Sequence, residues 1–266
     1  MKNIKFLFII LILMGLQSCE DVVDVDLTTA EPRLVIEATG IQKENNSFGE
    51  FRVKLSETAP YFQDSIPAVS EAEISLEIED QVFEIPEIEE NSGIYKQQIP
   101  MIYEEEYKLT VKVNEEQYQG ETYLYQTVPV DSIAQEEGFF DPEEVLLKIF
   151  FTDPAEEENY YLFSYESKHG KQLMPVDDEY FDGNQMTTLY MEEFDLEDSI
   201  KIKVNGTGKQ FNKYISILLE QGSSNNPFAT APTTVRGNMI NMNNSEKFPL
   251  GYFRISQQFE TVYVVE

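Results

Sequence analysis

The chain has a single cysteine, Cys19, a single histidine, His169, and no tryptophan. One cysteine cannot form a disulfide within the chain, and a zinc site would need a cluster of histidines or cysteines. Basic residues are also scarce, since 19 Lys and Arg stand against 49 Asp and Glu for a net charge of −30. Such a charge repels nucleic acid and anionic membrane surfaces, so we expect no nucleic-acid partner.

Motifs for catalysis are equally scarce. No G-x-S-x-G sequence marks a serine nucleophile, and His169 beside Gly170 is typical of a turn. A pair of carboxylates, as in glycosidases, remains an open alternative, although with 49 acidic residues some pairs lie close by chance. We therefore expect a non-enzymatic protein, with hydrolysis by a carboxylate pair as the enzymatic alternative.

The N-terminal residues carry the most informative pattern. Lys2 and Lys5 flank an apolar run, Phe6 to Leu16, that is too short to span a bilayer. The run ends in Leu16-Gln17-Ser18-Cys19, which resembles a bacterial lipobox, whose cysteine becomes lipid-modified. We expect residues 1–18 to be a signal peptide and acylated Cys19 to anchor the mature chain in membrane lipid.

An acidic tether, residues 19–30, follows the signal peptide. Glu20, Asp21 and Asp24 resemble the export signal that places lipoproteins of Bacteroidota on the cell surface. The pattern predicts an outer-membrane lipoprotein that faces the cell exterior. In other bacteria an acidic second residue favours retention at the inner membrane, so this interpretation depends on the source.

Hydrophobic residues alternate with polar ones from Arg33 onward. Phe51–Leu55, Ile74–Glu79 and Tyr107–Val113 show this period of two most clearly, which is typical of half-buried antiparallel strands. About seven short strands in this region predict an Ig-like antiparallel β-sandwich over residues 31–128. The cysteines and tryptophan of true Ig domains are missing, so the likeness concerns architecture. A turn is expected at Gly40.

Residues 129–266 are predicted to form a C-terminal antiparallel β domain. Strands are expected at Val145–Phe151, Tyr160–Tyr165, Met186–Phe194 and Ser199–Val204, with a final pair at Gly251–Ser256 and Thr261–Val265. One short α-helix interrupts them near residues 209–221, because apolar residues there follow a helical spacing. Gly222 suits the end of that helix. The chain as a whole is thus predicted to be all-β with one helix.

The loop from Asp177 to Asn184 is the best candidate for a cation site. Asp177, Asp178 and Asp182 supply oxygen ligands, and Gly183 lets the chain bend, which are the features that Ca²⁺ requires. An EF-hand is excluded because its third and twelfth positions would be Tyr180 and Leu189. A solvated acidic loop is the alternative interpretation, and we expect no other cofactor.

A second candidate is a binding loop between residues 226 and 241. Asn226, Phe228, Arg236 and Asn238 would contact the ligand, with Arg236 as a rare cation in an acidic chain. The alternative is a buried connection whose asparagines satisfy backbone groups.

Several segments together resemble the DUF4249 lipoproteins of Bacteroidota. The similar segments are Ser18-Cys19-Glu20-Asp21, Glu31 to Glu37, Asn159 to Leu162, Asp177-Asp178 with Phe181 to Gly183, Asn226 to Phe228, Gly237 to Ile240 and Leu250 to Phe253. The family has no established activity, and its members are often encoded beside TonB-dependent receptors. The resemblance implies an accessory that binds a ligand for uptake by such a receptor. An envelope structural or adhesion protein without a transport partner is the alternative.

Overall fold

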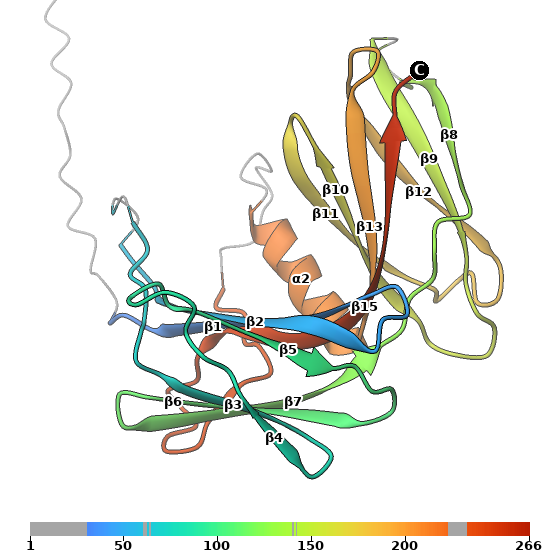
Figure 1. Ribbon diagram of the computed structural model, residues 1–266. Helices are drawn as coiled ribbons and strands as arrows, with labels where there is room; N and C mark the ends of the chain where they lie inside the picture. Colours follow the sequence, from blue (N-terminus) through green and yellow to red (C-terminus); the bar gives the residue numbers. More distant parts are fainter. Residues whose placement is uncertain (1–30, 61–62, 64, 140, 142, 223–232) are drawn as a thin grey trace, which may run out of the picture. The chain divides into compact units, whose positions relative to one another are not determined.

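The structure is a computed structural model that describes residues 31–60, 63, 65–139, 141, 143–222 and 233–266. The described residues are all-β with one helix, as predicted (Figure 1). Contacts group residues Pro32–Glu266 into one compact unit. Among the described helical residues, no stretch is long and apolar enough to cross a membrane.

Two layers of strands enclose the first hydrophobic core, which confirms the predicted sandwich. Alternate side chains point into this core, such as Ile36 and Ala38 from one layer and Leu109 and Val111 from the other. One layer contains β1 (Leu34–Lys43), β2 (Phe48–Glu57) and β5 (Ile94–Pro100). The other contains β3 (Glu73–Ile78), β4 (Gln81–Glu84), β6 (Glu106–Val113) and β7 (Glu116–Tyr125), with the short β14 (Ile240–Asn241) at its edge.

A second core, rich in aromatic rings, lies between a three-stranded sheet and another part of the large sheet. Phe151 and Phe163 approach to 5.0 Å between ring centroids, and Tyr165 stacks on Tyr190 at 4.6 Å. The three-stranded sheet has the order β12 (Gln185–Glu193), β9 (Glu144–Thr152), β8 (Ser132–Glu137). The facing strands are β10 (Tyr160–Ser167), β11 (Gly170–Asp177) and β13 (Ser199–Thr207).

One long strand, β15 (Leu250–Val264), belongs to both cores. Phe253 and Ile255 lie in the first core, whereas Tyr263 packs against the second. The expected final pair of strands is therefore wrong: the two runs form one strand. β15 pairs antiparallel with β13 but parallel with β1 and β7, so the sheet is mixed where an antiparallel one was predicted. The domain boundary after residue 128 stays a prediction.

Two glycines allow close approach of chain segments around β15. Gly40 was expected in a turn, but β1 continues through it, and a Cβ there would lie 3.0 Å from the Ile255 side chain. Gly251 has a φ of +91°, and a Cβ there would lie 2.1 Å from the Ile36 carbonyl oxygen. Gly251 is thus required where β15 begins to pair with β1.

The helix α2 (Lys209–Gly222) lies where the apolar spacing predicts it. The Phe211 and Tyr214 rings contact the Tyr252 ring, with centroids 5.0 and 4.9 Å away. The Asn212 side-chain amide donates to the Val176 carbonyl oxygen at 3.0 Å. Because Tyr252 alternates with the core residue Phe253, α2 covers the face of the sheet that points away from both cores.

Candidate functional site

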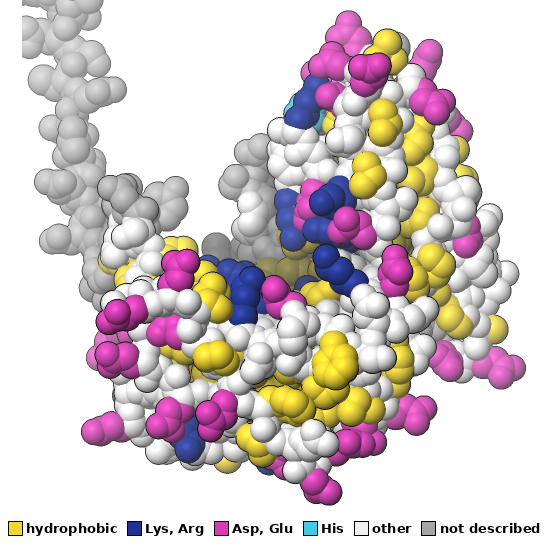
Figure 2. Space-filling model, in the orientation of Figure 1, with side chains coloured by type: hydrophobic (Ala, Val, Ile, Leu, Met, Phe, Trp, Pro, Cys, Tyr) yellow, Lys and Arg dark blue, Asp and Glu magenta, His cyan; other side chains and the backbone are white. Residues whose placement is uncertain are grey.

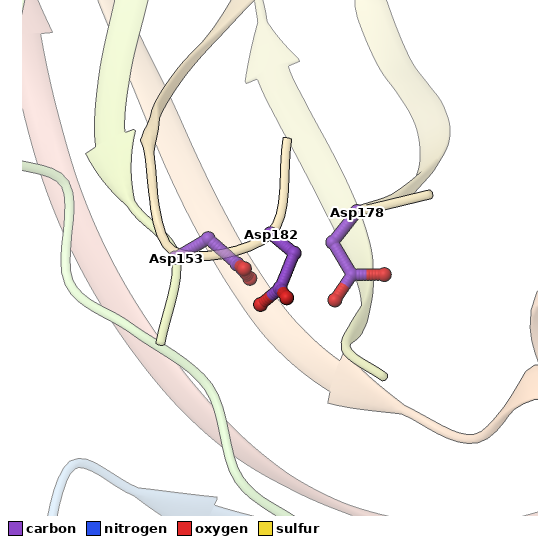
Figure 3. A group of neighbouring side chains, drawn as sticks. All are labelled: Asp153, Asp178 and Asp182. Carbon is purple, nitrogen blue, oxygen red and sulfur yellow. The ribbon is translucent and has the colours of Figure 1, made fainter. Parts of the chain in front are cut away.

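Three aspartates converge at one end of the second core, as Figure 3 shows. Asp153 follows β9, and Asp178 and Asp182 lie in the loop between β11 and β12. One carboxylate oxygen from each lies within 4.8 Å of the others. Asp153 and Asp178 are only 2% and 4% exposed, so these two carboxyl groups are held away from water.

This acidic cluster differs from the predicted triplet by one residue. Asp178 and Asp182 were expected, but Asp153 takes the place of Asp177. Asp177 ends β11, and its carboxylate accepts a 3.4 Å hydrogen bond from the Glu179 backbone N–H instead. Asp153 was missed because it lies 25 positions earlier and reaches the loop only through the pairing of β9 with β12.

Each carboxylate of the acidic cluster already accepts hydrogen bonds. The Asp153 carboxylate accepts hydrogen bonds from the Tyr161 hydroxyl at 2.5 Å and from the Gly183 N–H at 3.2 Å. Asp178 accepts a hydrogen bond from the Asn159 N–H at 2.7 Å, and Asp182 accepts one from the Glu156 N–H at 2.9 Å. Burial and the bond to Asp153 raise the pKa of Tyr161, so its hydroxyl stays protonated and donates. These bonds join the loop after β9 to the loop between β11 and β12.

A groove of about 410 Å³ runs beside α2. Tyr214 and Ile217 of α2 form one wall, and Tyr252 and Arg236 contribute from the strand and the segment that precedes it. Burial raises the pKa of both tyrosines, so the groove presents neutral hydroxyls at physiological pH. Its volume lies in the usual range for small-ligand sites, about 300–1,000 Å³.

Half of the predicted binding loop borders this groove. Arg236 and Asn238 line it, whereas Asn226 and Phe228 lie outside the described residues. The Asn238 amide donates to the Phe253 carbonyl at 2.8 Å, and its oxygen accepts the Phe253 N–H at 2.8 Å. This pattern favours the alternative role, in which an asparagine satisfies backbone groups of a neighbouring strand.

Arg236 has a freer side chain. Its guanidinium lies 4.7 Å from the centroid of the Phe248 ring, and Arg33 lies 4.3 Å from the same ring. Neither guanidinium has a carboxylate within 4.0 Å among the described residues. Arg236 therefore keeps its charge available to the groove.

The remaining sequence candidates lie elsewhere. His169 is exposed in the hairpin between β10 and β11, where its Nε2 lies 2.6 Å from the Glu193 carbonyl oxygen. Cys19, Glu20, Asp21 and Asp24 lie outside the described residues. The sequence did not single out Tyr214 and Tyr252 as groove residues. Tyr214 is one of the residues with helical spacing that predict α2, and only the packing of α2 on β15 brings the two rings together.

A protein-family model matches most of the chain. The family described as "Domain of unknown function (DUF4249)" matches residues 20–261. The chain belongs to this family. The match confirms the resemblance that the sequence showed and covers every described site residue discussed above, and no curated protein matches the chain.

Several solved structures match part of the chain. Bovine butyrophilin is 12% identical, covers 66% of this chain and 92% of its own, and has a TM-score of 0.23. A segment of two fibronectin type-III domains from chicken tenascin is 11% identical, and the match covers 66% of this chain and 90% of the tenascin segment, with a TM-score of 0.22. The chicken interferon gamma receptor alpha chain is 10% identical, and the match covers 66% of this chain and 88% of the receptor chain, with a TM-score of 0.21.

Proposed function

We propose that this DUF4249 protein is an outer-membrane lipoprotein that binds a ligand without chemical conversion and assists a TonB-dependent receptor in nutrient uptake. The lipobox-like Leu16 to Cys19 supports the anchor, and Glu20, Asp21 and Asp24 support exposure at the cell surface. The receptor partnership rests on the family resemblance described above.

The groove beside α2 is the observation that carries the binding role. It combines a ligand-sized volume, tyrosine side chains and the uncompensated Arg236 guanidinium. Ligand sites commonly join apolar walls with a few fixed polar groups in this way. The groove walls come from α2, β15 and the chain before β14, so its shape depends on packed elements.

Co-purification tests this proposal. The protein would be tagged at its C-terminus, extracted gently from outer membranes of cells that express a candidate receptor, and analysed with its partners by mass spectrometry. A receptor in stoichiometric amount supports the uptake role. An Arg236→Gln variant, with Lys247→Gln as the matched control, then tests whether a small ligand that co-purifies depends on the groove.

Recovery of the protein alone would contradict the uptake role. The favoured function would then be the alternative, an envelope structural or adhesion lipoprotein whose sandwich acts as a spacer. The strand β15, which belongs to both hydrophobic cores, suits such a spacer because it ties the two cores into one covalent element.

A further inference from the structure

One face of the large sheet carries an unusual share of the basic residues of this acidic chain. The strands β11, β10, β13, β15, β1, β2 and β5 follow one another in the pairing, and both cores lie on one of their two faces. On the opposite face, cross-strand register aligns the basic residues with one another. We call this the basic face: Lys43, Arg52, Lys54, Lys96, Lys171, Lys201, Lys203 and Arg254.

Acidic residues are outnumbered on the basic face, although they outnumber basic ones 49 to 19 in the whole chain. By the same register, the acidic side chains on these strands are Glu37, Glu50, Glu166, Asp177 and Glu260. Figure 2 shows Lys and Arg side chains gathered in the hollowed middle of the drawn face, with some Asp and Glu side chains among them and others along the edges. Basic residues are thus concentrated on this face relative to the chain as a whole.

Four of the five acidic residues of the basic face form ion pairs with its lysines. Glu166 binds the Lys203 ammonium at 2.8 Å, and Glu50 binds Lys96 at 3.1 Å. The same pattern continues with Glu37 and Lys54 at 3.1 Å and with Glu260 and Lys201 at 3.8 Å.

Three cations of this face remain uncompensated. Lys43, Arg52 and Arg254 have no carboxylate within 4.0 Å in the described part of the chain. Arg254 instead donates to the Ser256 hydroxyl at 2.7 Å and lies over the Phe211 ring. Arg254 and Arg52 both lie opposite Thr39, on the strands that flank β1. The positive charges therefore lie side by side across three strands.

A cleft of about 600 Å³ opens over this region. Lys43, Arg52 and Lys203 line it, together with amide side chains that can donate hydrogen bonds, Asn46, Gln98 and Gln258. Arg52 of β2 lies opposite Thr39 of β1, and Lys43 lies four residues further along β1. The Cα atoms of Lys43 and Arg52 are therefore about 14 Å apart. Two long side chains at that spacing can reach two charged groups of one molecule.

We propose that this cleft binds a small soluble anion that carries at least two carboxylate or phosphate groups. Arg52 supplies a planar fork that matches either group with two parallel hydrogen bonds, and Lys43 supplies a point charge for the second group. Glu50 and Glu260 also line the cleft, but their pairing with Lys96 and Lys201 reduces their repulsion of the ligand. This proposal does not depend on a receptor partnership.

Calorimetric titration of the full-length lipoprotein in detergent tests the proposal, with citrate and pyrophosphate as separate probes in calcium-free buffer. We expect binding at low ionic strength that weakens as salt is added, because the cleft is open to solvent. Arg52→Gln and Lys43→Gln should each reduce affinity by about tenfold, since each removes a charge-assisted hydrogen bond. Arg52→Lys should give an intermediate loss because it keeps the charge without the fork.

Lys112→Gln is the matched control, because Lys112 lies on β6, outside the cleft, and forms only an exposed 3.8 Å pair with Glu73. If only citrate binds, the ligand class is a polycarboxylate, and if only pyrophosphate binds, it is a polyphosphate. Binding of both probes shows that the cleft recognises negative charge rather than one type of group. The proposal is overturned if the wild-type protein binds neither probe, or if folded Arg52→Gln and Lys43→Gln proteins bind as well as the Lys112→Gln control. Circular dichroism confirms that each variant is folded.

Discussion

At the scale of single residues, short polar side chains form hydrogen bonds with backbone groups that have no strand partner. Asn238 pairs with both backbone groups of Phe253, and the Asn241 oxygen accepts the N–H groups of Asn243 and Asn244. Asp153 and Asp178 join loops in the same manner. Polar residues that the sequence offers as binding groups are therefore often occupied within the protein itself.

Asn238→Ala tests this structural role. The substitution leaves the Phe253 N–H and carbonyl without their side-chain partner, which should cost about 2 kcal/mol of unfolding free energy. A chain of this size should then melt about 5 °C lower. Asn243→Ala is the control, since Asn243 accepts only an exposed bond from the Gln117 N–H. Equal melting temperatures for the two variants would contradict the prediction, and differential scanning calorimetry measures them.

The calcium hypothesis also belongs to this scale and stays a prediction. Three carboxylates within 4.8 Å repel one another, and a cation would relieve that repulsion. If the site binds Ca²⁺, calcium should raise the melting temperature of the wild-type protein relative to chelator, and Asp182→Ala should abolish the difference. Glu77→Ala, on the exposed side of β3, is the control. Identical melting with calcium and with chelator would leave the cluster as a loop-joining feature only.

At the scale of elements, charged pairs connect neighbouring strands on the basic face. Glu166 of β10 accepts two hydrogen bonds from the Lys203 ammonium of β13, at 2.8 and 2.9 Å. Lys203, with Lys171 and Lys201 nearby, lowers the pKa of Glu166 below its usual 4.5. A pKa that is lower in the folded protein means that the unfolded chain holds this proton more tightly.

Glu166→Gln should therefore destabilise the protein in a pH-dependent way. The stabilisation by ionised Glu166 is fully present above pH 4.5 and is lost as the pH falls through the lower pKa of the folded state. We expect a loss of about 1 kcal/mol at pH 7 that shrinks toward zero below pH 4. Denaturant titration across this range measures it, and a pH-independent difference between variant and wild type would refute the prediction.

At the scale of the whole molecule, the segment that resembles a signal peptide and the net charge of −30 bear on location rather than on fold. A strongly acidic surface is repelled by anionic lipid, so the proposed attachment to the membrane would depend on acylation of Cys19. Cys19→Ala should abolish acylation and shift the protein from the membrane fraction to the soluble fraction. Immunoblots of fractionated cells measure the shift, with Ser92→Ala in the β4–β5 turn as a control. An unchanged membrane fraction would remove the basis for the anchoring proposal.

Much of the architecture was predictable because it depends on local patterns. Alternating strands such as Phe51–Leu55 and Tyr107–Val113 bury one face, and the helical spacing of Phe211 to Leu219 places α2 correctly. β8 and β11 were missed because they have few buried residues and show no clear alternation. The two runs at the C-terminus were separated because the polar Gln257 and Gln258 interrupt them. Gln257 is buried and binds the Thr127 N–H and the Glu44 carbonyl instead.

The sequence by itself determined the strand-rich class, the helix, the lipobox-like segment and the membership in the DUF4249 family, because these depend on residues that are neighbours along the chain. Tertiary structure decided which distant residues meet. Asp153 joins Asp178 and Asp182, Tyr214 meets Tyr252, and Arg254 aligns with Arg52 through the parallel pairing of β15 with β1. Strand order and register determine these contacts. The register is in turn selected by the burial of one face along the whole sheet.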